Sequence, residues 1–379
     1  MSIQPSNTSS SDKVPELRFP EFQKEWSIEK LGVNFEMKSG DFVPAKEIES
    51  EPNTNLYPCY GGNGLRGFTK SFTHEGRYNL IGRQGALCGN VNLVEGRFHA
   101  TEHAVVVNNI ENFDVDFIYY ILNNLQLNRL ATGQAQPGLS ISILNSVKFY
   151  STQLPEQQKI ATFLTAIDQR IQLLQQKKAK LEEYKKGVMQ KLFTQEIRFK
   201  IEGPDGKLVK PPDWEEKRLG EICEKQSSNI SANSLEESGG DYKIYGATGF
   251  LQFVDFFREE EPYISIVKDG AGVGRILLCE AKSSVLGTLD ILKPKGENNI
   301  HFLYALISTI RFEKYTTGST IPHIYFKDYS KEKISVPTHV EQNKIASFLT
   351  SLDDSIKSLE VEIDSSIVYK KGLLQKMFV

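Results

Sequence analysis

Two long stretches of the chain place apolar residues at alternating intervals of four and three positions. The first stretch lies in residues 154–200 and the second in residues 339–379. A mean spacing of about 3.5 residues keeps one apolar seam on the same side of a helix, as a coiled coil requires. The predicted seam comprises Ile160, Leu164, Ile167, Ile171, Leu174 and Leu181, followed by Ile345, Leu349, Leu352, Ile356, Leu359 and Ile363.

Both stretches are therefore predicted to be long helices. Pro155 and Glu156 suit a first turn, where the missing N–H of proline is not needed. At about 1.5 Å per residue such a helix is roughly 55 to 60 Å long. Lys178, Lys185 and Lys370 fall on the seam, so it is only mostly apolar. A core helix of an ordinary bundle is the alternative, although globular helices average only about 11 or 12 residues.

The other residues are typical of mixed α/β structure with short strands and glycine-rich turns. We expect strands at residues 78–82, 104–107, 263–267 and 289–292, and helical stretches at 115–130 and 300–315. A turn-rich connector at residues 202–206 and 211–212 separates two halves. The predicted organisation is a disordered tail (1–14), a first domain (15–153), a long helix with the start of a linker (154–200), the linker and a second domain (201–338), and a second long helix (339–379).

The two halves are repeats of one another. Tyr60 recurs as Tyr245 and Pro137 as Pro322, and both pairs are separated by 185 residues. The helical stretches match closely at this spacing, whereas the globular parts share glycines and aromatic residues but few polar side chains. A tandem duplication follows, in which two divergent modules sit on one repeated scaffold.

Composition places limits on the class of protein. A chain of 379 residues predicts two or three domains. No segment has the roughly 18 to 20 consecutive apolar residues that a membrane-spanning helix needs. The four cysteines are far apart in the sequence, which fits a reducing cytoplasm and argues against zinc ribbons. The net charge is −3, so overall charge does not indicate a nucleic-acid-binding protein.

Two motifs suggest catalytic or cofactor chemistry, but their context argues against it. His99 and His103 fit an H-x-x-E-H zinc motif, yet a strand-like valine run follows where the motif needs a helix. The glycines of residues 270–274 resemble a phosphate-binding loop without the Gly-Lys-Ser/Thr or helix-opening glycine. No nucleophile, metal or carboxylate set recurs in both halves, so neither catalysis nor a metal site is predicted.

Polar side chains do accompany the shared glycines in both halves. Arginine, lysine, glutamine and asparagine can pair with base edges, and glycine lets backbone approach closely. Ordinary solvated loop residues are the alternative for any single position. The candidates beside the glycine turns are Asn63, Arg66, Lys70, Arg83 and Gln84 in the first half and Thr248, Gln252 and Lys268 in the second. Those after the repeated Thr-Gly turns, 132–133 and 317–318, are Gln134 and Gln136 in the first half and Ser319, Thr320 and His323 in the second.

In these features the chain resembles the specificity subunits of type I restriction-modification systems. The resemblance covers nearly everything after residue 14 and includes the opening segment 17–22 with Trp26. Its most specific motifs are Glu-Gln-x-Lys-Ile-Ala-x-Phe-Leu-Thr, from Glu156 and again from Glu341, and Tyr-Lys-Lys-Gly-x-x-Gln-Lys-x-Phe, from Tyr184 and again from Tyr369.

The resemblance implies an α/β fold with two tandem target recognition domains, each reading one half of a split, asymmetric double-stranded DNA sequence. The two long helices would pack as an antiparallel coiled coil. Two modification subunits, with or without restriction subunits, would assemble with the chain. Those modification subunits would use S-adenosylmethionine, so the chain itself would bind no cofactor and catalyse no reaction. A coiled-coil assembly adaptor whose domains bind other ligands is the rival hypothesis. Affinity for DNA that falls steeply with salt would distinguish the two.

Overall fold

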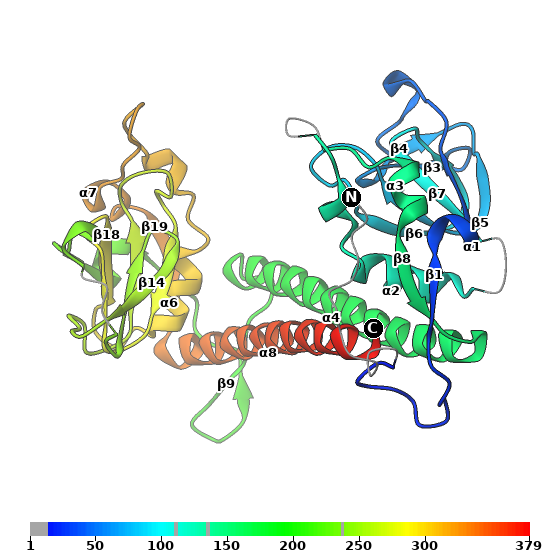
Figure 1. The fold of residues 1–379 in the computed structure, drawn as a ribbon. Coiled ribbons are helices and arrows are strands. Elements are labelled where there is room, and N and C mark those ends of the chain that lie inside the picture. Colours follow the sequence, from blue (N-terminus) through cyan, green and yellow to red (C-terminus); the bar gives the residue numbers. More distant parts are fainter. Residues whose placement is uncertain (1–13, 110–112, 134–136, 236–238) are drawn as a thin grey trace. The chain divides into compact units, whose positions relative to one another are not determined.

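The computed structural model describes residues 14–109, 113–133, 137–235 and 239–379 (Figure 1). Apart from Val14, the tail predicted at residues 1–14 lies outside the described residues. The chain divides into two compact units, Met1–Gln175 with Val361–Val379 (unit 1) and Gln176–Glu360 (unit 2). Each unit contains strands and helices, which confirms the predicted α/β class.

Unit 1 is built on a six-stranded sheet in the order β2-β7-β5-β6-β3-β4. Neighbouring strands are antiparallel except β3 and β6, which are parallel. A separate antiparallel pair, β1 with β8, leads into the first long helix. The strands are β1 Ser27–Lys30, β2 Phe35–Ser39, β3 Tyr57–Gly61, β4 Gly64–Thr69, β5 His74–Gly82, β6 Val91–Ala100, β7 Ala104–Asn109 and β8 Lys148–Ser151; the helices before α4 are α1 Leu31–Asn34, α2 Val115–Asn124 and α3 Ile141–Ser146.

Unit 2 repeats this plan with its strands divided between two main sheets, β12-β18-β15-β16 and β14-β13-β17. The pair β11–β19 corresponds to β1–β8, and a small hairpin of β9 and β10 precedes it. The strands are β9 Ile201–Glu202, β10 Leu208–Val209, β11 Glu215–Arg218, β12 Cys223–Ser227, β13 Tyr242–Gly246, β14 Gly249–Val254, β15 Tyr263–Val267, β16 Ile276–Cys279, β17 Ser283–Val285, β18 Leu289–Pro294 and β19 Lys333–Val336; the short helices are α5 Leu219–Ile222, α6 Ile300–Ile307 and α7 Phe326–Tyr329.

The four predicted strands are present as parts of β5, β7, β15 and β18. The two predicted helical stretches are shorter than expected. The stretch 115–130 stops at Asn124, because Gln126 adopts a left-handed conformation, and a 3₁₀ turn covers Leu127–Leu130. The stretch 300–315 stops at Ile307, where the hydroxyls of Ser308 and Thr309 donate hydrogen bonds to carbonyls of the last turn.

The predicted long helices are α4, Leu154–Phe193, and α8, His339–Met377. In unit 1 the beginning of α4 packs against the end of α8, where Lys370 lies 2.5 Å from Asp168. In unit 2 the end of α4 packs against the beginning of α8, where Lys185 pairs with Asp353. The helices therefore run antiparallel. Every residue of the predicted seam is buried or half-buried, which confirms the coiled-coil pattern.

Asp168 and Asp353 occupy the same position in the two repeats, as do Lys185 and Lys370. The ion pairs Lys370–Asp168 and Lys185–Asp353 are therefore one contact formed twice. The lysines that interrupt the apolar seam are satisfied by carboxylates of the facing helix. A buried or half-buried charge without such a partner would be costly, so these pairs favour this register of the two helices.

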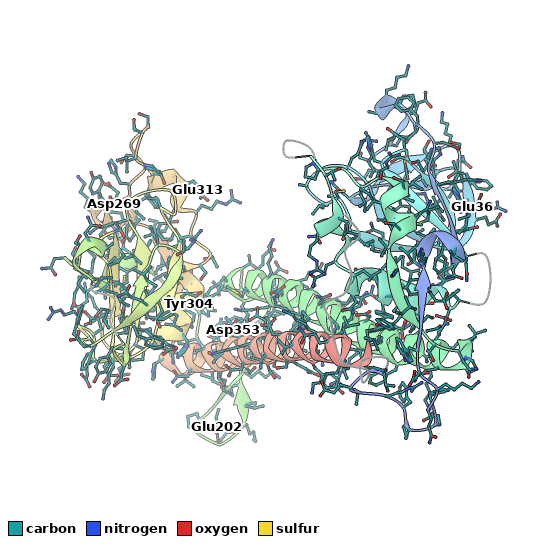
Figure 2. The ribbon with its side chains drawn as sticks, viewed as in Figure 1. Glu36, Glu202, Asp269, Tyr304, Glu313 and Asp353 are labelled. Carbon is teal, nitrogen blue, oxygen red and sulfur yellow. The ribbon has the colours of Figure 1, made fainter. Side chains whose placement is uncertain are left out.

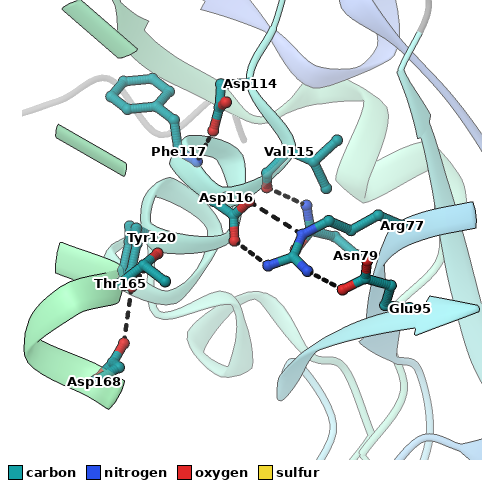
Figure 3. Close-up of polar contacts among 10 residues, drawn as sticks. All are labelled: Arg77, Asn79, Glu95, Asp114, Val115, Asp116, Phe117, Tyr120, Thr165 and Asp168. Carbon is teal, nitrogen blue, oxygen red and sulfur yellow. Dashed lines mark hydrogen bonds and ion pairs between the residues drawn. The ribbon is translucent and has the colours of Figure 1, made fainter. Parts of the chain in front are cut away.

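The sheet of unit 1 is joined to α4 through α2 (Figure 3). Tyr120 of α2 donates a hydrogen bond to Asp168 of α4 at 2.8 Å. Asp116, one turn earlier on α2, accepts two bonds from Arg77 of β5. In unit 2, burial together with the carboxylate of Asp353 raises the pKa of Tyr304 on α6 (Figure 2). The backbone N–H of Asn299, just before α6, also donates to the side-chain oxygen of Gln342 on α8 at 3.0 Å, so each module is fixed to the helices by polar contacts as well as by apolar packing.

No helix in the described part of the chain is long and apolar enough to cross a membrane. All four cysteines are buried free thiols.

Candidate nucleic-acid interface

The turn between β3 and β4 forms the tip of a hairpin in unit 1. Gly64 has a φ of 95°, a conformation that favours glycine. Just below the tip the strand pairing shifts, because Cys59 faces Gly67 while Tyr60 faces Leu65. Arg66 is the extra residue of this β-bulge. Since a bulge breaks the alternation of side chains between the two faces of a strand, both Leu65 and Arg66 are exposed.

Unit 2 has the same tip with different side chains. Gly249 has a φ of 116°, and the pairing shifts so that Tyr245 faces Phe250, leaving Leu251 as the extra residue of the bulge. Phe250 and Leu251 are both exposed. The two units therefore share the turn glycine and the β-bulge, whereas the side chains exposed at the tip differ.

In unit 1 the tip forms one side of a surface pocket of about 320 Å³. Asn63, Arg66 and Gln84, all predicted from the sequence, line this pocket together with Leu65 and His103. Amide, guanidinium and imidazole groups can each donate hydrogen bonds, and the amides also accept them. The pocket thus offers the kinds of groups that read base edges.

The Thr-Gly turn of each unit lies beside its glycine loop, which is residues 85–90 in unit 1 and 270–274 in unit 2. In unit 1 Gly85 N donates to Pro137 O at 3.0 Å, and in unit 2 Gly270 N donates to Pro322 O at 2.9 Å. The second candidate set of unit 2 is therefore adjacent to its glycine loop. Ser319 and Thr320 are exposed there.

The remaining candidates of these turns are placed differently. His323 is half-buried, and its backbone forms isolated β-bridges with Thr317 and with Asp269. Gln134 and Gln136 lie outside the described residues.

Two candidates direct their charge into the fold. Lys268 lies 3.2 Å from the buried carboxylate of Asp290, and Arg83, at the equivalent repeat position, donates to the hydroxyl of Ser39 on β2. Both residues follow the strand that leads to the glycine loop, so they fix the base of that loop. The charge of Lys268 is thus paired within the fold, and its role in reading bases stays a prediction.

The other candidates do not converge on one site. Lys70 is exposed just beyond the end of β4, and Thr248 is exposed in the β13–β14 turn. Gln252 is half-buried within β14. These positions are near the hairpins but are not brought together in a pocket like that of unit 1.

The residues of the two rejected motifs lie in a strand and in turns. His99 is buried at the end of β6, 3.3 Å from the Ser71 hydroxyl, whereas His103 lies in the turn before β7 and lines the pocket. Within the described ranges no His, Cys, Asp and Glu side chains gather as a metal site requires. The loop 270–274 joins two antiparallel strands, β15 and β16, so no helix N-terminus is available there to bind phosphate.

Sequence reasoning missed Leu65, Phe250 and His103. The signal for the first two was present, since a large apolar residue follows the turn glycine in both repeats, 185 residues apart. This signal indicates a functional residue only together with the β-bulge, which exposes the apolar side chain. The H-x-x-E-H pattern indicates His103 only as a metal ligand.

Comparisons with known proteins agree with this organisation. The family model described as "Type I restriction modification DNA specificity domain" matches residues 23–183 and 211–367. The type I restriction enzyme EcoprrI specificity subunit of Escherichia coli is 40% identical over 153 residues, which make up 40% of this chain and 38% of that protein. A putative type I restriction enzyme specificity subunit of Haemophilus influenzae, S.HindORF215P, is 23% identical over 334 residues, or 80% of this chain and 81% of that protein.

The fold also matches a solved structure along most of its length. The type I restriction-modification system S subunit from M. genitalium superimposes with a TM-score of 0.72 and 22% identity, covering 97% of this chain and 99% of that chain. At this level of identity the likeness concerns the fold alone.

Proposed function

Since this chain belongs to the type I restriction modification DNA specificity domain family, we propose that it recognises a bipartite, asymmetric DNA sequence for a type I restriction-modification enzyme, without catalysing a reaction itself. One observation carries the proposal. Two units share the hairpin, the bulge and the adjoining Thr-Gly turn, yet they present different side chains at the tip. Two units that share a backbone structure but carry different exposed side chains are suited to bind two different half-sites.

The partners would be two copies of one modification subunit, which would hold S-adenosylmethionine and methylate adenine. The repeated helices support this stoichiometry. Tyr184 on α4 and Tyr369 on α8 occupy the same repeat position, and both are exposed within identical Tyr-Lys-Lys-Gly segments. Exposed tyrosines are frequent contact residues in protein interfaces. Two equivalent surfaces are expected to bind two copies of the same partner, whether or not restriction subunits join them.

The negative net charge of the chain is compatible with DNA binding, because positive side chains are present locally. Arg66 and Lys70 are exposed near one hairpin, so positive charge is available where the DNA would bind. Further affinity would come from the modification subunits. For the rival adaptor function we find no supporting observation.

The function is tested by mapping methylated adenines in cells with and without this gene. We expect one bipartite motif to lose its methylation when the gene is deleted and to regain it on complementation. An unchanged methylome in cells that express the modification subunit would contradict the proposed function.

Exchanging residues 27–150 for the corresponding domain of another family member should change one half of the recognised sequence completely and leave the other half intact. The tip and pocket of unit 1 lie wholly within this segment, whereas those of unit 2 lie outside it. Methylome mapping is the measurement, and the exchange of the second domain is the matched control. A change in both half-sites would show that the units do not read DNA independently.

A further inference from the structure

An apolar side chain stands at the hairpin tip of each unit, and in unit 1 it lies among groups suited to hydrogen bonding. Leu65 is 55% exposed and Phe250 is 50% exposed, and the two occupy the same repeat position. A single exposed leucine on a protein surface needs no explanation. These two recur at one position, however, and in both units the β-bulge turns the next side chain outward as well.

The surroundings of Leu65 indicate what it contacts. Its pocket neighbours Asn63, Arg66 and Gln84 carry amide and guanidinium groups, which form paired hydrogen bonds with adenine and guanine edges in the major groove. In that groove the one apolar feature of a base pair is the 5-methyl group of thymine. An apolar side chain held among base-reading groups is therefore complementary to a thymine methyl group.

We propose that Leu65 in unit 1, and Phe250 at the equivalent position of unit 2, contact the 5-methyl group of a thymine in their respective half-sites. The inference rests on the proposed function and deepens it by naming the base feature that each residue reads. The strand pairing supports this assignment, because it continues up to the tip in both units, where Gly61 pairs with Gly64 and Gly246 pairs with Gly249. A fixed tip presents its side chain at one position along the groove.

The experiment uses the full chain assembled with its modification subunits and a duplex carrying the site identified by methylome mapping. Each thymine is replaced in turn by deoxyuridine, which lacks only the 5-methyl group. For the unaltered protein, one replacement in the half-site of unit 1 should weaken binding about fourfold, as expected for one buried methyl group. Leu65→Ala should lose this sensitivity, binding thymine and uracil duplexes within about twofold of each other.

The controls separate a base contact from a general effect. Leu87→Ala removes an exposed leucine from the neighbouring loop, outside the residues that line the pocket, and should retain the uracil sensitivity. Phe250→Ala should lose sensitivity in the other half-site only. The dependence of affinity on salt should be the same for Leu65→Ala as for the unaltered protein, because no phosphate contact is removed.

Three results would overturn the inference: no uracil position that weakens binding in the half-site of unit 1, equal sensitivity in Leu65→Ala, or a half-site without any A·T pair. None of these results would contradict the proposed function as long as the complex still binds the target more tightly than a scrambled duplex. A complex without such a preference would refute the proposed function itself, and a loss of modification-subunit binding in Leu65→Ala would instead assign the tip to a protein contact. Leu65→Met, which keeps an apolar side chain, should preserve the uracil sensitivity.

Discussion

Replacing Arg198 by methionine is expected to lower the free energy of unfolding by about 3 to 5 kcal/mol, because it leaves a buried carboxylate without its partner. The side chain of Glu341, in the first turns of α8, is 0% exposed. Arg198 donates a hydrogen bond to each oxygen of the Glu341 carboxylate, from Nε to Oε1 at 3.1 Å and from Nη2 to Oε2 at 2.7 Å. Trp214 donates a further bond to the same carboxylate. Urea denaturation of the full chain measures the loss.

The repeat provides a second example of this pair and a contrasting exposed pair. Arg18 binds Glu156, which is 1% exposed, in the equivalent place of unit 1, so Arg18→Met should have a similar effect. Arg170 pairs with Glu362 on the surface and is 69% exposed, so Arg170→Met should cost less than about 1 kcal/mol. Adding Glu341→Gln to Arg198→Met removes the buried charge and should restore part of the stability. Equal losses for Arg198→Met and Arg170→Met would contradict this account.

The helices and the repeat could be predicted from the sequence because their signals are periodic. The seam from Ile160 to Leu181 repeats one spacing over several turns, and its copy 185 residues later confirms the register. The strand Tyr263–Val267 was also identifiable, since it is buried along its whole length and reads as a continuous run of mainly apolar residues. These features depend on the local sequence alone.

The candidate site was predictable only in part, because its geometry depends on pairing between distant residues. Lys268 meets Asp290 through the register of β15 with β18, which no spacing in the sequence reveals. The bulge at Arg66 comes from a one-residue shift between strands and has no sequence signal beyond its glycines. The early end of α2 depends on Gln126 adopting a conformation that is uncommon for a residue with a side chain.

Inserting one heptad after Leu174 and another after Leu359 should lengthen the spacer between the two recognised half-sites by about three base pairs. Seven residues add about 10 Å to a helix, and DNA rises about 3.4 Å per base pair. Both insertions fall one residue before the boundary between the units, at Gln175 and Glu360. The contacts inside each unit, such as Lys370–Asp168 and Lys185–Asp353, are therefore retained.

The two inserted segments should also face one another. Arg170 contacts Glu362 on one side of the insertion points, and Lys185 contacts Asp353 on the other, so the added heptads continue one antiparallel seam. Three extra base pairs rotate one half-site by roughly 100° about the DNA axis, and the deformation needed to compensate should weaken binding at the new spacing.

The matched control is an insertion of one residue after Leu174 alone. It rotates the following apolar positions by about 100° off the seam, so we expect loss of the folded helix pair and of DNA methylation. Methylome mapping of both variants gives the spacer directly. If the double-heptad variant is folded and active but retains the original spacer, the helices do not set the distance between half-sites, and the modification subunits must place the two domains on the DNA.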